Sequence, residues 1–163
     1  MKLSGFQPLI NAESVFSSII DKSVVYLIIY VDDILVVTAS ELALTKVKTL
    51  LSKLYKIKDL GIAEYFLGVK IEREHKQVKL TQESYTRGVL ERYGMLESKP
   101  TSTPMVQSSD LMLKSSCSES DSKRMLGVPY REAIGSLLFL AVRTRPDIAV
   151  AVSILSKHVQ CPV

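Results

Sequence analysis

The 163-residue sequence has few cysteines, no long apolar run and little net charge. Its two cysteines, Cys117 and Cys161, are too few for a disulfide framework or a cysteine metal cluster, as is typical of intracellular proteins. The longest apolar run, Val24–Val31, has eight residues, whereas a membrane-spanning helix needs about 20. Residues Met1–Ile10 do not resemble a signal peptide. We therefore expect an intracellular protein, cytoplasmic or nuclear, without a membrane-spanning segment.

The overall composition predicts a folded chain. Hydrophobic residues make up 47% and charged residues 23% of the sequence, which excludes disorder throughout and allows a hydrophobic core. Lys and Arg number 21 against 17 Asp and Glu, so the net charge is +4. This mild positive charge is compatible with nucleic-acid binding but does not by itself indicate it.

The first half of the chain predicts a strand hairpin followed by a helix. Val24–Val31 and Ile34–Thr38 are rich in β-branched residues, and Asp32-Asp33 between them has the length of a tight hairpin turn. Ser40 is a good helix N-cap. A helix to Tyr55 follows from the helical spacing of four apolar residues: Leu44, Val47, Leu51 and Leu54.

The second half predicts another hairpin and more helices. Strands are expected over Tyr65–Arg73 and Val78–Leu80, and then a helix from Thr81 to Tyr93 that ends at Gly94. Residues 98–123 are rich in serine and predict a linker or long loop. Residues 130–158 predict two helical segments, separated at Pro146. Their apolar faces are Ile134, Leu137, Leu138 and Ala141 in the first and Ile148, Val152 and Leu155 in the second.

The pair Asp32-Asp33 is the strongest candidate for chemistry. Two carboxylates about 4 Å apart repel by about 1 kcal/mol in water and about 4 kcal/mol at a protein surface. A turn with no other role is more simply built from Asn-Gly or Asp-Gly. Carboxylate oxygens are ligands for hard cations such as Mg²⁺. The pair therefore fits either a metal site or a solvated acidic turn.

Several motifs cover almost the whole chain: VYLIIYVDDIL at 25–35, YKIKDLGIAEYFLGVKIER at 55–73, LTQESY at 80–85, YGMLESKPTSTPM at 93–105 and YREAIGSLLFLAVRTRPDIAVAVSILS at 130–156. These motifs, in this order, resemble copia-type retrotransposon reverse transcriptases, which are RNA-directed DNA polymerases. The resemblance implies an α+β fold. Residues 1–97 would be the C-terminal part of a polymerase palm, built of antiparallel hairpins with packing helices. Residues 98–129 would be a Ser-rich linker or long loop, and residues 130–163 a helical thumb segment.

The resemblance also implies roles for individual residues. Asp32 matches the carboxylate that binds the catalytic Mg²⁺ (or Mn²⁺) ions, and Asp33 its less direct neighbour, so both are predicted catalytic and metal-binding residues. The second hairpin resembles the primer grip, which positions the primer end. The implied partner in the intact enzyme is an RNA template paired with a DNA primer, and the predicted nucleic-acid-binding residues are Tyr30, Phe66, Leu67, Gly68, Lys46, Lys48 and Lys53.

Purely structural roles are alternatives for some of these residues. The three lysines also fit the solvated face of an amphipathic helix. Gly68 also fits a β-bulge.

The family's polymerase site needs a third carboxylate upstream of the two aspartates. The 31 residues before Asp32 contain no matching motif. We therefore expect an incomplete two-ion site, a chain that does not polymerise DNA alone, and the missing polymerase half as a candidate partner. Two alternatives are a non-catalytic remnant that binds nucleic acid or a partner, and an unstable chain in which Val24–Val31 is an unpaired apolar edge.

Overall fold

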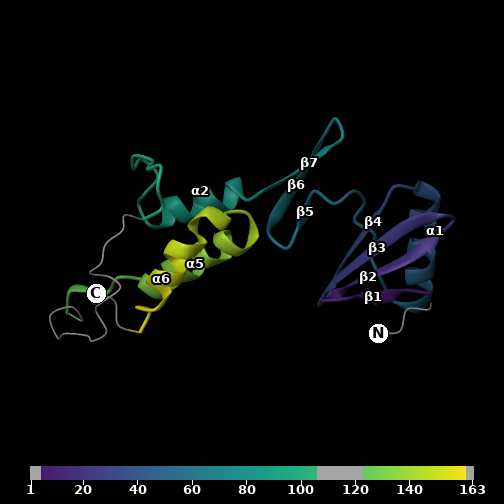
Figure 1. The fold of residues 1–163 in the computed structure, drawn as a ribbon, viewed down its shortest axis with the longest axis horizontal. Coiled ribbons are helices and arrows are strands. Elements are labelled where there is room, and N and C mark those ends of the chain that lie inside the picture. The colour runs from purple at the N-terminus through teal and green to yellow at the C-terminus, as the bar shows by residue number, and fades with distance from the viewer. Residues whose placement is uncertain (1–4, 106–122, 161–163) are drawn as a thin grey trace. The chain divides into compact units, whose positions relative to one another are not determined.

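The computed structural model describes residues 5–105 and 123–160. Within them the chain forms antiparallel sheets and helices, which confirms the predicted α+β class (Figure 1). The chain divides into two compact units, residues 1–66 and residues 67–163. Most of the predicted Ser-rich linker, together with Cys117 and Cys161, lies outside the described residues.

The first unit contains a four-stranded antiparallel sheet in the order β1-β2-β3-β4. β3 is paired on both sides, so the alternative in which Val24–Val31 is an unpaired apolar edge is wrong. The sequence analysis missed β1 and β2, because serines interrupt the apolar residues of β2 and weaken its strand pattern. The strands are β1 (Gln7–Leu9), β2 (Ala12–Ile20), β3 (Ser23–Tyr30) and β4 (Asp33–Thr38).

The turn between β3 and β4 lies one residue earlier than predicted. Tyr30 pairs with Asp33, so the turn residues are Val31 and Asp32, and Asp33 is the first residue of β4. The register is set by side-chain alternation, since Ile34 and Val36 must face the core.

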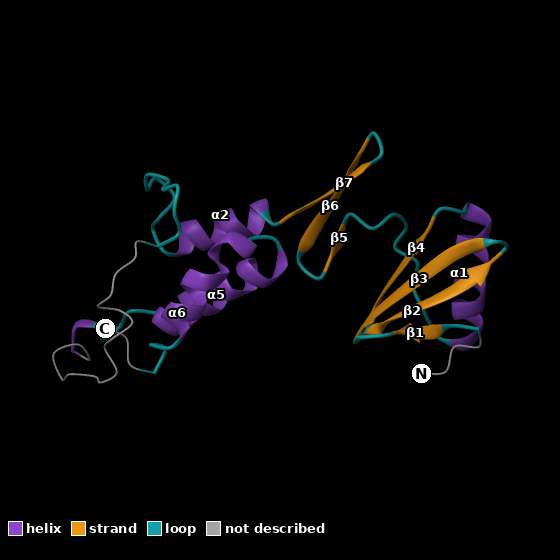
Figure 2. Cartoon of the chain, viewed as in Figure 1, coloured by secondary structure: helices purple, strands orange, loops and turns teal. Residues whose placement is uncertain are grey.

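Helix α1 (Glu41–Leu54) lies against one face of this sheet (Figure 2). As predicted, Ser40 caps it: its Oγ accepts a hydrogen bond from the Ala43 N–H at 3.3 Å. The core joins the helix to β3 and the N-terminal segment. Leu54, predicted on the apolar face, is 52% exposed, because it is the last residue of the helix. The buried residues are Phe6, Val25, Leu27, Ala43, Val47 and Leu51.

The predicted second hairpin is present, but its first strand is interrupted. In place of one strand over residues 65–73, β5 (Tyr65–Phe66) and β6 (Val69–Glu74) are separated by a turn at residues 67–68. Both turn residues have positive φ, 52° for Leu67 and 78° for Gly68, which a continuous strand does not allow. β7 (Gln77–Thr81) then pairs antiparallel with β6.

Helix α2 (Glu83–Arg92) follows directly. Its N-cap residue is Gln82 rather than the predicted Thr81, although Thr81 Oγ1 accepts a hydrogen bond from the Glu83 N–H at 3.3 Å. Gly94 follows the end of the helix, as predicted, with φ 65° and its N–H donating to the Glu91 carbonyl.

The C-terminal helices are α5 (Tyr130–Arg143), the 3-10 helix η1 (Pro146–Ile148) and α6 (Ala149–Ser156). The predicted break at Pro146 is confirmed. Leu138, predicted in the apolar face, is 48% exposed, and Leu140 is buried instead, because the buried stripe is rotated toward Leu140. Among the described residues, no helix has the length and apolar character to cross a membrane. The core is formed by Ile134, Ala141 and Val152 with Tyr130, Leu137, Ile148, Leu155 and Val159 around them.

Candidate functional site

The tip of the β3–β4 hairpin brings three predicted site residues together. Tyr30 is the last residue of β3, Asp32 lies in the turn and Asp33 begins β4. All three are exposed. The hairpin therefore presents two adjacent carboxylates and one aromatic ring to solvent at one end of a well-packed sheet.

The backbone at this tip is strained. Val31 has φ 53°, a left-handed conformation that is unfavourable for a β-branched residue. Asp32 does not share the positive φ, so the turn has the φ pattern of type II′, in which glycine normally occupies the first position. The surrounding strand pairs must hold Val31 in place, and such strain is typical of functional sites.

Val31→Gly is expected to raise the stability of the first unit. The left-handed conformation costs a non-glycine residue about 1–2 kcal/mol, glycine costs about 0.5–1 kcal/mol in chain entropy, and Val31 is 83% exposed, so little packing is lost. The net gain of about 0.5–1 kcal/mol is measurable by urea unfolding. Val37→Gly, at an exposed position of β4 in the same unit, is the control and should destabilise. A loss of stability in Val31→Gly would show that the backbone at Val31 is not strained.

The two carboxylates fit a divalent cation by their chemistry. Neither Asp32 nor Asp33 forms an ion pair within the described part of the chain, so their oxygens are open to a ligand. In residues 5–105 and 123–160, no group of three or more His, Cys, Asp or Glu side chains could hold a metal ion. The described residues thus offer two adjacent oxygen donors for hard cations.

Two of the predicted nucleic-acid-binding lysines have acidic partners. On α1, Lys46 Nζ lies 2.6 Å from Asp21 Oδ1, and Lys48 Nζ lies 2.8 Å from Asp59 Oδ2. The hydrogen bond from Lys48 lowers the pKa of Asp59. Lys53 is exposed and has no ion pair among the described residues.

The structure places Lys46 away from the carboxylate tip. Asp21, its partner, lies in the β2–β3 turn, at the opposite end of β3 from Asp32. With eight residues in β3, the two ends of the strand are separated by about 25 Å at the usual rise per residue. A nucleic acid that contacts Lys46 would therefore extend well beyond the tip.

Of the predicted primer-holding residues, Phe66 and Leu67 are half-buried and Gly68 is exposed. A Cβ atom at Gly68 would lie 3.0 Å from Cζ of Phe139, closer than side chains normally approach. The alternative of a β-bulge is wrong, because residues 67–68 form a turn. Both the positive φ and the nearby ring account for glycine at this position.

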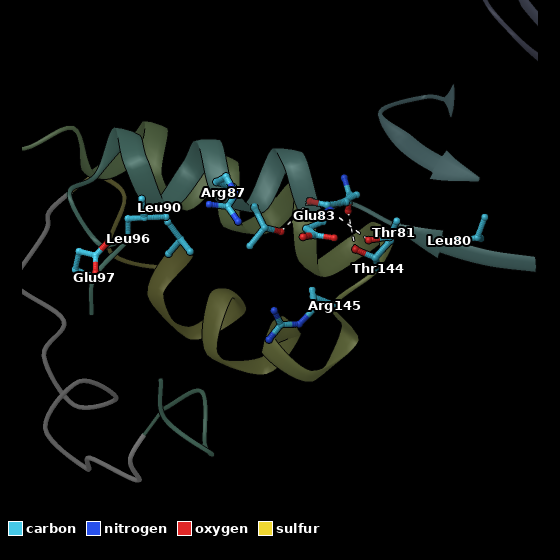
Figure 3. Close-up of a pocket in the computed structure, with 11 residues that line it drawn as sticks. Leu80, Thr81, Glu83, Arg87, Leu90, Leu96, Glu97, Thr144 and Arg145 are labelled. Atoms are coloured by element: carbon cyan, nitrogen blue, oxygen red, sulfur yellow. Dashed lines mark hydrogen bonds between the residues drawn. The ribbon is translucent and has the colours of Figure 1, made fainter. Parts of the chain in front are cut away.

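Sequence reasoning missed a groove in the second unit. It has a volume of about 570 Å³ and runs along α2, with Arg87 and Leu90 on one side and Arg145 on the other (Figure 3). No periodic or motif signal marks it, because its walls come from separate segments: β7, α2, the segment after α2 and the segment after α5. The lining residues are Leu80, Thr81, Gln82, Glu83, Thr86, Arg87, Leu90, Leu96, Glu97, Thr144 and Arg145.

The charges in this groove are largely balanced. Arg145 binds Asp147 through two nitrogens, with Nε 2.9 Å from Oδ1 and Nη2 2.7 Å from Oδ2. This pairing lowers the pKa of Asp147. The other charged residues that line the groove are one cation, Arg87, and two carboxylates, Glu83 and Glu97. The groove has no excess of positive charge that would mark it as a phosphate site.

The family model and similar known proteins indicate the same family. The model of the reverse transcriptase (RNA-dependent DNA polymerase) family matches residues 1–107. A retrovirus-related Pol polyprotein from transposon TNT 1-94 of Nicotiana tabacum is 41% identical over 150 residues, which is 90% of this chain and 11% of that protein. The Pol polyprotein from transposon RE2 of Arabidopsis thaliana is 35% identical over 158 residues, 97% of this chain and 10% of that protein.

A further relative is an uncharacterized mitochondrial protein of Arabidopsis thaliana. It is 38% identical over 137 residues, covering 84% of this chain and 54% of that protein. The chain thus spans about a tenth of the two Pol polyproteins. No solved structure matches it.

Proposed function

Because the chain belongs to the reverse transcriptase (RNA-dependent DNA polymerase) family, we propose that it is the C-terminal palm and thumb portion of a copia-type retrotransposon polymerase. In this proposal residues 1–97 belong to the palm, residues 98–129 are the connection and residues 130–163 belong to the thumb. The intact enzyme would extend a DNA primer on an RNA template.

The observation that carries the proposal is the carboxylate pair at the hairpin tip. Asp32 lies in the turn, exposed and without a basic partner among the described residues, and we assign it as the ligand for Mg²⁺ or Mn²⁺, with Asp33 in a supporting role. When bound, two such ions activate the primer hydroxyl and stabilise the leaving pyrophosphate. The strained turn at Val31 would hold the Asp32 carboxylate in a defined place.

The nucleic-acid contacts follow from the same assignment. Tyr30 offers an exposed ring beside the carboxylates, and aromatic faces stack on bases. The turn at Leu67 and Gly68, together with Phe66, would hold the primer end. Lys46, Lys48 and Lys53 would neutralise phosphates of the template–primer duplex.

A polypeptide of these 163 residues is expected not to extend a primer by itself. Two adjacent carboxylates cannot easily hold two ions in near-octahedral geometry with the substrate phosphates. The test is a primer-extension assay with the purified chain, Mg²⁺ or Mn²⁺ and a primed RNA template. Robust extension that disappears in Asp32→Ala would overturn this expectation.

Charge reversal of the lysines tests the duplex contacts. Losing one phosphate contact weakens binding roughly fivefold at physiological salt and reduces the salt dependence by about one unit of slope. Lys53→Glu should have the largest single effect, because Lys46 and Lys48 already pair with aspartates. The measurement is fluorescence anisotropy with an RNA–DNA hybrid. Asp21→Asn, which frees Lys46, should strengthen binding; unchanged affinity in all of these variants would remove the lysines from the interface.

The same experiments distinguish the alternative function, a non-catalytic remnant that binds nucleic acid or a partner. In a remnant, Asp32→Ala would change neither Mn²⁺ binding nor primer extension, whether the chain is tested alone or with the missing polymerase half. The lysine variants would still bind the RNA–DNA hybrid more weakly. In the polymerase portion proposed here, Asp32→Ala weakens Mn²⁺ binding at the tip. Paramagnetic broadening of the backbone signals of residues 31–33 by Mn²⁺ provides the readout.

A further inference from the structure

The turn at Leu67 and Gly68 lies against a single aromatic side chain of α5. Gly68 has φ 78°, and a Cβ atom added there would lie 3.0 Å from Cζ and 3.5 Å from Cε1 of Phe139. The backbone of the turn is therefore within contact distance of the ring edge. Glycine fits this approach without a shift of the ring, whereas a Cβ atom would require the ring to move by a few tenths of an ångström.

Two further side chains hold the Phe139 ring. Tyr85 of α2 meets it edge to face, with ring centroids 4.9 Å apart and planes at 61°. The guanidinium carbon of Arg143, one turn along α5, lies 5.3 Å from the ring centroid, a cation–π distance. The ring is half-buried and is fixed by contacts from α2 and from its own helix.

The other end of the β6–β7 hairpin is tied to the same helix. Gln82, at the junction of β7 and α2, is 95% buried, since its exposed fraction is 5%. Its Oε1 accepts a hydrogen bond from Oγ1 of Thr144, the C-cap residue of α5, at 2.8 Å. The hairpin thus begins at Gly68 and ends at Gln82, and both ends contact the C-terminal part of α5.

β6 and β7 belong to a small three-stranded sheet in which β5 has only two residues. A sheet this small depends for its stability and its position on what it packs against. We propose that Phe139 is a positioning residue for the Leu67–Gly68 turn: it seats the turn on α5 and so determines where the turn meets the 3′ end of the primer. This inference rests on the proposed function, in which the turn holds the primer end. Phe139 itself need not touch nucleic acid.

The test uses the full chain and two RNA–DNA hybrids of equal length, one blunt and one with a recessed primer 3′ end. Fluorescence anisotropy gives the preference for the recessed end, and thermal melting reports folding. Phe139→Leu and Gly68→Ala are expected to lower the preference by about tenfold, because a misplacement near 1 Å can cost about 10²-fold in a positioned contact. Affinity for the blunt hybrid should stay within about twofold of the unmodified chain, since the general phosphate contacts remain.

Gly127→Ala is the matched control. Gly127 has φ 82°, close to that of Gly68, but a Cβ atom there meets nothing within 4 Å. The control therefore introduces the same backbone strain without the contact to a ring, and it should leave the preference unchanged. The double variant Gly68→Ala with Phe139→Leu should lose no more of the preference than either single variant, because both substitutions remove the same contact.

The outcomes separate the two proposals. If the unmodified chain prefers the recessed end and neither Phe139→Leu nor Gly68→Ala changes this, the positioning role is wrong and the function of the turn stands. Equal effects of Gly68→Ala and Gly127→Ala also overturn the positioning role. If the unmodified chain has no preference for the recessed end, the primer-holding function fails, and the positioning role fails with it. If Phe139→Leu melts at a much lower temperature, Phe139→Met takes its place.

Discussion

A chimeric polymerase in which this chain replaces the matching segment of the tobacco Pol polyprotein is expected to lose primer extension when Asp32 becomes Asn. The substitution keeps the shape of the side chain and removes its charge, so the proposed metal ligand becomes a weak neutral donor. Removing one group that stabilises charge in a transition state typically costs about 10²–10³-fold, and a metal ligand should cost at least about 10²-fold. Extension rates of a primed RNA template measure the loss.

Two further variants make this result specific. Asp33→Asn should cost less than Asp32→Asn, because Asp33 begins β4 and is assigned only a supporting role. Glu41→Gln is the control, since Glu41 begins α1 beyond the end of β4 opposite to Asp33, is exposed and forms no ion pair among the described residues. Extension by the Asp32→Asn chimera at a rate within twofold of the parent would remove Asp32 from the catalytic site.

Leu27→Ala is expected to destabilise the first unit by about 2–5 kcal/mol, the usual cost of a buried leucine truncated to alanine. Leu27 is fully buried at the centre of β3, where it packs in the core with α1. A unit of this size buries only about 60% of its unfolded surface and has little stability to lose. Much of the variant should therefore be unfolded, which hydrogen exchange of the β3 amides during urea titration would measure.

The matched control for this variant is Leu60→Ala. Leu60 is 81% exposed in the segment after α1, so its truncation should change stability by no more than about 0.5 kcal/mol. Leu27→Met keeps most of the buried volume and should cost less than about 1.5 kcal/mol. A loss below about 1 kcal/mol in Leu27→Ala would show that the sheet and α1 do not share a rigid core.

The sequence allowed the elements with strong local signals to be predicted. The β3 strand is a continuous run of β-branched and aromatic residues, α1 has a serine cap and helical apolar spacing, and Pro146 interrupts the C-terminal helices. β2 was missed because its pairing with β3, rather than its own pattern, makes it a strand. The exact position of the β3–β4 turn was wrong by one residue because it depends on cross-strand register.

Some features of the candidate site could also be predicted from the sequence, and others could not. The Asp32-Asp33 pair and the family could be predicted from the sequence, because the motifs are contiguous and appear in the order typical of the family. The ion pairs of Lys46 and Lys48, and the contact between Gly68 and Phe139, join residues far apart in the chain. No local pattern encodes such contacts, so they could not be predicted.

The sequence by itself determined the family, the α+β class and the adjacent carboxylates, since these depend on residue identity and short-range spacing. Only the tertiary structure decided that Val31 lies in a strained turn at the tip and that the Phe139 ring lies against the Leu67–Gly68 turn. The physical reason is that register and side-chain contact arise from packing between distant segments, where the burial of apolar surface outweighs local preference.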